Sequence, residues 1–150
     1  MMIMAFLGSA RSEQLKFIER LAQEIAPDYR VKMVNFAGLP VAQRINTIRR
    51  CCAEGIPPYA VLAFTGITTE EEIIFLQKRR ASFVVMPGSL PRVLMTGSIE
   101  IDHSFIFAHI DPQTLDTEAK RRTYQDPETA FSSCLLAEMK RNRGTVNAIC

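Results

Sequence analysis

Apolar segments of strand length alternate with amphipathic segments of helix length through most of this chain, and that alternation restricts its fold more than any other feature. Met2 to Leu7 is continuously apolar, as is typical of a strand that is covered on both faces in a parallel sheet. The segment after it repeats apolar residues at helical spacing from Leu15 to Ile25, and Pro27 ends it. Ser9 or Ser12 is expected to cap this helix.

The same pairing of strand and helix continues along the chain. Further strands are predicted at Arg30 to Phe36, Tyr59 to Phe64, Ser82 to Met86 and Ser104 to Ile110. Helices are predicted from Val41 to Cys52, closed by Gly55 and Pro57, from a capping box at Thr68 and Glu71 or at Thr69 and Glu72, and from Asp126 with Pro127 at the first position. The alternation predicts an α/β fold, with a three-layer, mainly parallel five-stranded sheet and helices on both faces.

The chain is predicted to form one α/β domain over residues 1–150, with a core over 1–110 and a C-terminal helix over 126–143. Its 150 residues are enough to bury a core without disulfides or a metal. The polar segment from Asp111 to Gln125 is expected to be a mobile loop or a short surface helix. No boundary between domains is expected.

Charge and cysteine content exclude several classes of protein. The 18 basic and 16 acidic side chains give a net charge of +2, which argues against a polybasic nucleic-acid binder. The four cysteines include an adjacent pair and no CxxC spacing, so neither a disulfide framework nor a metal site is expected. The apolar run at the start is too short for a signal peptide or a membrane span, and we expect a soluble, cytoplasmic protein without a membrane partner.

The turn after the first strand is the first candidate for a binding site. In a parallel α/β sheet, ligands bind outside the carboxyl ends of the strands. Gly8 and Ser9 lead into a helix whose N–H groups would face an anion, and Arg11 and Ser12 could add contacts to a nucleotide or another anion. The alternative is a strand-to-helix turn that holds no ligand.

Several runs resemble the P-loop deoxynucleoside monophosphate kinases of phages and bacteria. Met2 to Gly8, with Arg11 and Ser12, resembles their first strand and phosphate loop. Thr65 to Glu71, followed by Phe83 to Val85, resembles the stretch where those kinases have a strand end, an Asp-Val-Arg-like turn, a glutamate-bearing helix and the next strand. Ser98 to Asp102 resembles the segment before their last core strand. The resemblance covers most of residues 1–110 and implies a P-loop-kinase-like fold.

The departures from this family fall at its catalytic positions. A phosphate loop of the GxxxxGK[ST] kind needs a second glycine and a lysine, and this chain has Glu13 and Gln14 near that place. The acidic residue and the arginine that the family carries after the third strand are replaced around Thr65, Gly66 and Ile67. Phosphoryl transfer depends on positioning and on electrostatic stabilisation by such groups. The resemblance therefore implies a pseudokinase.

Secondary candidates lie elsewhere in the chain. Thr65 follows the third strand, and Glu100, Asp102 and His103 gather before the fifth, where they could act as acid, base or ligands. The alternative for His103 and His109 is a half-buried strand face shared with two phenylalanines. Four basic groups could instead meet a nucleic acid or a phosphorylated ligand, although such charges also occur at solvated helix ends: Arg44 with Arg49 and Arg50, Lys78 to Arg80, Lys120 to Arg122, and Lys140 to Arg143.

Three functions remain open from the sequence. The first is a catalytically silent, nucleotide-kinase-like protein that binds a protein partner or a nucleotide as a regulator. It needs no cofactor beyond a nucleotide ligand, and it is compatible with a homodimer. The second is a nucleotide- or nucleoside-processing enzyme, such as a deoxyribosyltransferase-like hydrolase, with Glu70, Glu71 or Glu100 as the carboxylate. The third is an accessory protein that binds nucleic acid through the arginine groups.

Overall fold

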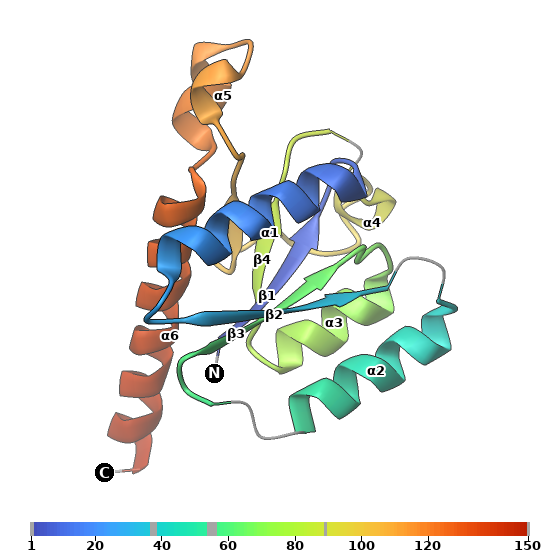
Figure 1. Cartoon of the computed structure of the whole chain (residues 1–150). Coiled ribbons are helices and arrows are strands. Elements are labelled where there is room, and N and C mark those ends of the chain that lie inside the picture. The colour runs from blue at the N-terminus through green and yellow to red at the C-terminus, as the bar shows by residue number, and fades with distance from the viewer. Residues whose placement is uncertain (1, 37–38, 54–56, 89, 150) are drawn as a thin grey trace.

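Five parallel strands form a single sheet in the order β2-β3-β1-β4-β5 (Figure 1). The structure is a computed structural model that describes residues 2–36, 39–53, 57–88 and 90–149; for residues 35 and 141–149 it describes the backbone alone. The strands are β1 (Met2–Leu7), β2 (Arg30–Asn35), β3 (Ala60–Thr65), β4 (Ser82–Val85) and β5 (Phe105–Phe107). All four strand pairings are parallel, so the predicted three-layer α/β class is confirmed.

Helices cover both faces of this sheet. The helical segments are α1 (Arg11–Ile25), α2 (Val41–Ala53), α3 (Glu70–Lys78), α4 (Arg92–Met95), the 3-10 turn η1 (Pro112–Thr114), α5 (Glu118–Thr123) and α6 (Pro127–Ile149). α1 and α6 pack on one face, and α2, α3 and α4 pack on the other. Figure 1 shows α5 projecting beyond the body of the domain, next to the start of α6.

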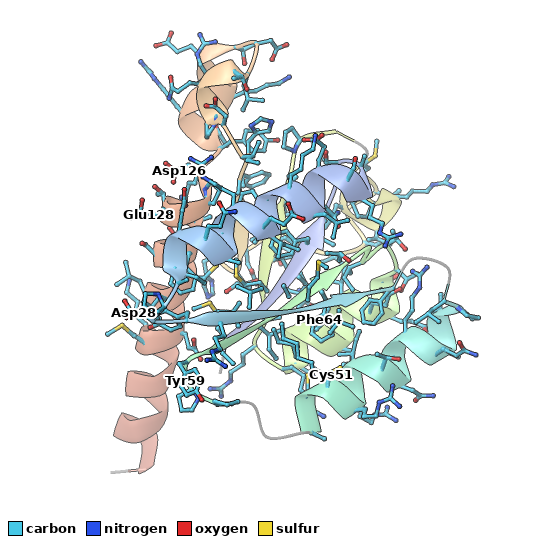
Figure 2. All side chains as sticks on the ribbon, in the orientation of Figure 1. Asp28, Cys51, Tyr59, Phe64, Asp126 and Glu128 are labelled. Atoms are coloured by element: carbon cyan, nitrogen blue, oxygen red, sulfur yellow. The ribbon has the colours of Figure 1, made fainter. Side chains whose placement is uncertain are left out.

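The core consists of two apolar layers separated by the sheet. Alternate residues of β1 supply both layers, with Phe6 facing α1 and Leu7 facing the α2 and α3 side. In the second layer the rings of Phe36 and Phe64 stack with centroids 5.4 Å apart. Figure 2 shows Phe64 and Cys51 on this side of the sheet. Each fully buried phenylalanine contributes about 1.5–3 kcal/mol through burial of apolar surface.

Helix starts follow the predicted capping chemistry in two places and depart from it in a third. Thr69, not Thr68, is the cap of α3, and its hydroxyl accepts a hydrogen bond from the Glu72 N–H. Asp126 caps α6 through the Thr129 N–H at 2.8 Å, with Pro127 at the first helical position. The prediction that Ser9 or Ser12 caps α1 is wrong, because the N-cap is Ala10 and no side chain bonds there.

The fifth strand is shorter than predicted. It covers Phe105–Phe107 instead of Ser104 to Ile110, because Ala108 leaves the ladder and forms an isolated bridge with Gln125. Residues 111–125, predicted as a loop or a short helix, contain both η1 and α5. The predicted stop at Gly55 lies outside the described residues. Of the helices that the structure describes, none has the length and apolar character needed to cross a membrane.

Candidate functional site

The connections between strands change direction at β1. The connection from β1 runs through α1 on one face toward β2, whereas the connections from β3 and β4 run through α3 and α4 on the other face. In sheets of this kind, ligands bind outside the strand ends where the connections reverse. The turns after β1, β3 and β4 therefore form the candidate site.

The backbone of the turn after β1 lies in close contact with the loop after β4. Gly8 has a φ of +81°, and a Cβ atom there would lie 2.4 Å from the Met86 carbonyl oxygen. Ser9 also has a positive φ of +60°, and its N–H donates to the Gly88 carbonyl at 2.6 Å. The Ser9 N–H, which would otherwise be available to an anion, is therefore used inside the protein.

Gln14 ties this turn to the loop after β3. Counted from Gly8, the phosphate-loop spacing places its lysine at position 14. The Gln14 side chain is 4% exposed; its Nε2 donates to the Gly8 carbonyl at 2.8 Å, and its Oε1 accepts from the Gly66 N–H at 3.1 Å. Both ends of the amide are satisfied within the protein. The sequence indicated only that a lysine is missing here, and the spacing from Gly8 was the signal for position 14.

The first turn of α1 offers a mixed environment to an anion. Arg11 and Ser12 are exposed at the helix start, where no side chain caps the N–H groups. Glu13 stands in the same turn and forms an exposed ion pair with Lys16 at 3.4 Å. The carboxylate stabilises the helix by interacting with its dipole, and it also repels a phosphate bound there. Of the predicted residues, Gly8, Ser9, Arg11 and Ser12 are thus brought together at this edge.

Thr65 lies at the same edge, but its side chain is buried. It is fully buried at the end of β3, and its hydroxyl donates to the Val34 carbonyl at 3.4 Å. Ile67, two residues further on, is 1% exposed and belongs to the apolar layer under α2 and α3. The two positions where the resemblance implies an acid and an arginine therefore carry a buried hydroxyl and a buried aliphatic group.

A buried ion pair between α2 and α3 was missed by the sequence analysis. Arg44 Nη1 lies 3.3 Å from Oε1 of Glu72, whose side chain is fully buried. The same oxygen accepts from the Thr69 hydroxyl at 2.8 Å, and Arg44 Nε donates to the Leu39 carbonyl at 2.6 Å. Glu72 Oε2 has no hydrogen-bond partner within the described part of the chain. The pair fixes α2 against the start of α3 at the carboxyl edge.

Glu100, Asp102 and His103 lie away from this edge. Asp102 and His103 precede β5, so they lie at the amino edge of the sheet, where they line a hollow of about 220 Å³ with Gln77 and Arg80. Glu100 is exposed on the same segment. The structure therefore does not bring Glu100, Asp102 and His103 together with Gly8 to Ser12.

Local hydrogen bonds hold Asp102, which precedes β5, and His109, which follows it. Asp102 Oδ1 accepts from the hydroxyl and the N–H of Ser104, and the hydroxyl bond is the main cause of a lowered pKa at Asp102. His109 Nδ1 accepts from the Asp111 N–H at 3.0 Å. Neither His103 nor His109 belongs to β5, so the predicted strand face with two histidines is wrong. In the described residues, no three His, Cys, Asp or Glu side chains gather as a metal site.

A groove of about 720 Å³ separates α1 from α5 and η1. Its walls carry both signs of charge, with Arg20, Arg121 and Arg122 balanced by Glu24, Asp111 and Asp126. Arg121 donates to the Leu115 carbonyl at 2.7 Å, and Arg122 pairs with Glu118 at 2.6 Å. This balance favours no class of ligand.

Comparison with known protein families, with curated proteins and with solved structures finds no match to this chain.

Proposed function

We propose that this protein is a catalytically silent, nucleotide-kinase-like α/β protein that acts as a binding or regulatory module for a protein partner or a nucleotide. The proposal rests on the resemblance of residues 1–110 to the P-loop deoxynucleoside monophosphate kinases, taken together with the contacts at the carboxyl edge. It assigns no phosphoryl transfer to the chain. In this proposal, the P-loop-like scaffold provides a surface that binds the partner or the nucleotide.

The contacts of Gln14 are the observation that carries this proposal. At the position where a phosphate loop places its lysine, a neutral amide is 4% exposed and bonds to the Gly8 carbonyl and the Gly66 N–H. A lysine in a phosphate loop supplies a cation to the outer phosphates, and an internally bonded amide supplies none. The substitution therefore removes a charge and also connects two loops that would otherwise flank a ligand.

Neighbouring groups support the same conclusion. The Ser9 N–H is used by Gly88, Glu13 brings negative charge to the first turn of α1, and Thr65 and Ile67 are buried. None of these groups offers a cation to a transferring phosphate. The lysine, the acid and the arginine that the resembled kinases carry at these positions are therefore replaced here by groups without those charges or roles.

The direct test is a phosphoryl-transfer assay on the purified protein. With radiolabelled ATP, Mg²⁺ and each deoxynucleoside monophosphate, we expect no labelled diphosphate above the background of a heat-denatured sample. An Arg11→Ala variant serves as the control for contamination. Diphosphate formation that the wild-type protein shows and the variant loses would overturn the proposal, because the activity would then belong to this site.

A nucleotide ligand without turnover is tested separately by thermal unfolding. A ligand that binds only the native state raises the melting temperature as its concentration increases. A shift with nucleotide, together with no diphosphate formation, identifies a nucleotide as the regulatory ligand. The absence of a shift leaves the protein partner as the ligand of the module.

A further inference from the structure

The C-terminal ends of α2 and α3 bring a group of cations to one rim of the domain. Both helices run from the carboxyl edge to the amino edge on the same face of the sheet (Figure 1). The exposed basic residues at these ends, here called the basic rim, are Arg49, Arg50, Lys78, Arg79 and Arg80. Cations are favoured near a helix C-terminus because they interact with the helix dipole. Five cations at two helix ends are more than this interaction explains.

Within α2 and α3 the acidic residues are separated from the basic rim; outside these helices, Asp102 lines one hollow with Arg80. α2 contains no acidic residue at all. The glutamates of α3 all fall in its first turn, at the opposite end of the helix, and one of them is bound to Arg44. Glu54 is the next acidic residue in the sequence after α2, and it lies outside the described residues.

Two guanidinium groups of the basic rim share one aromatic ring. Arg49 from α2 and Arg79 from α3 lie 5.6 Å and 5.4 Å from the ring centroid of Phe75. Stacking restricts these side chains and leaves the N–H edges of the planar groups for a bidentate partner. Among the residues that the structure describes, neither group has a carboxylate partner.

Arg80 stands where the backbone favours glycine. It follows α3 with a φ of +60°, while its N–H and that of Ala81 bond to the Gln77 and Leu76 carbonyls. This is the left-handed position that ends many helices and that glycine occupies at the lowest cost. Arginine at this position is more strained than glycine would be, and its exposed side chain belongs to the basic rim.

We infer that the basic rim is a docking surface for an acidic segment of a protein partner. Arginine pairs with carboxylates in a bidentate manner, and the guanidinium groups of Arg49 and Arg79 are held side by side on Phe75. A nucleic acid fits less well, since both guanidinium groups already cover the Phe75 ring on which a base could stack, and the net charge is only +2. The inference rests on the proposed function as a binding module.

The test is fluorescence anisotropy with a short fluorescein-labelled polyglutamate peptide at low salt. We expect saturable binding that weakens as salt is added. Arg49→Ala combined with Arg79→Ala should reduce the affinity at least about tenfold, because two charge-assisted contacts are lost. Lys16→Ala combined with Arg122→Ala is the matched control: it removes the same charge from α1 and α5, which are not part of the basic rim, and should change the affinity less than about twofold.

Arg80→Gly provides a second variant, because glycine is the residue that this left-handed position favours. We expect it to keep a cooperative urea transition, while its affinity for the peptide falls. Equal loss of binding in the basic-rim variant and in the control would overturn the inference. So would the absence of peptide binding, whether or not a labelled oligothymidine binds. The kinase assay is independent, so the proposed function can fail while peptide docking holds.

Discussion

Replacing Gly8 with alanine should destabilise the protein far more than the same change at Gly97. Both glycines have a left-handed φ, +81° and +75°. A Cβ at Gly8 would meet the Met86 carbonyl oxygen at 2.4 Å, whereas one at Gly97 would meet nothing within 4 Å. The loss of stability in Gly97→Ala therefore measures the conformational cost alone. The loss in Gly8→Ala also includes the steric cost of a Cβ between the loops after β1 and β4.

The two costs can be estimated separately. The left-handed conformation costs alanine about 1–2 kcal/mol, and the stiffer unfolded chain returns about 0.4–1 kcal/mol, so Gly97→Ala should lose roughly 1 kcal/mol. Gly8→Ala must also move backbone that is held by the bond from the Ser9 N–H to the Gly88 carbonyl. Overpacking of this kind adds about 1–3 kcal/mol, which gives a total near 3 kcal/mol.

Urea unfolding followed by circular dichroism measures the difference. A gap of about 2 kcal/mol corresponds to a midpoint difference of roughly 1 M at an m-value of about 2 kcal/mol/M. Equal midpoints for Gly8→Ala and Gly97→Ala would refute the reasoning, because they would mean that the β4 loop does not press on Gly8.

Three further predictions concern charge and protonation. Arg44→Ala should cost about 3 kcal/mol, because it leaves the buried Glu72 carboxylate without its cation, and adding Glu72→Gln should recover part of that loss in urea unfolding. Ser104→Ala should raise the pKa of Asp102 toward its ordinary value in an NMR titration. Since the hydroxyl bond lowers that pKa in the folded state, its stabilisation is present at neutral pH and is lost as the pH falls through the folded-state pKa, so wild type and variant should converge in acid. Burial raises the pKa of the Cys52 thiol, and Arg79 partly offsets this by lowering it. Iodoacetamide should therefore label Cys52 more slowly in the folded protein than in urea, and Arg79→Ala should slow the labelling further. Unchanged labelling rates, measured by mass spectrometry, would contradict this.

Local sequence patterns predicted most of the fold. Continuous apolar runs gave the positions of β1, β3 and β4 to within a residue or two, and the Asp126 cap with Pro127 gave the start of α6. These features depend on neighbours in the sequence. β5 was overestimated because the alternation continues to Ile110, whereas its actual end depends on a bridge between Ala108 and the distant Gln125.

The contacts at the candidate site depend on residues far apart in the sequence, and for that reason the sequence did not reveal them. Arg44 and Glu72 are 28 residues apart, and each alone fits a solvated helix face. Gln14 bonds to Gly66 across 52 residues. The order of the strands is likewise a matter of tertiary packing, and the alternation of strands and helices does not specify it. Only the absence of the phosphate-loop lysine was visible from sequence spacing.

The bonds of Gln14 also affect how this edge could change by mutation. Installing a lysine at position 14 would supply the missing cation, but it would at the same time leave the Gly66 N–H without its acceptor and remove a bond to Gly8. The gain of a phosphate contact and the loss of local order would come from one substitution. Phosphate binding at this edge would therefore require compensating changes in the loops after β3 and β4 as well, so a single mutation is not expected to create it.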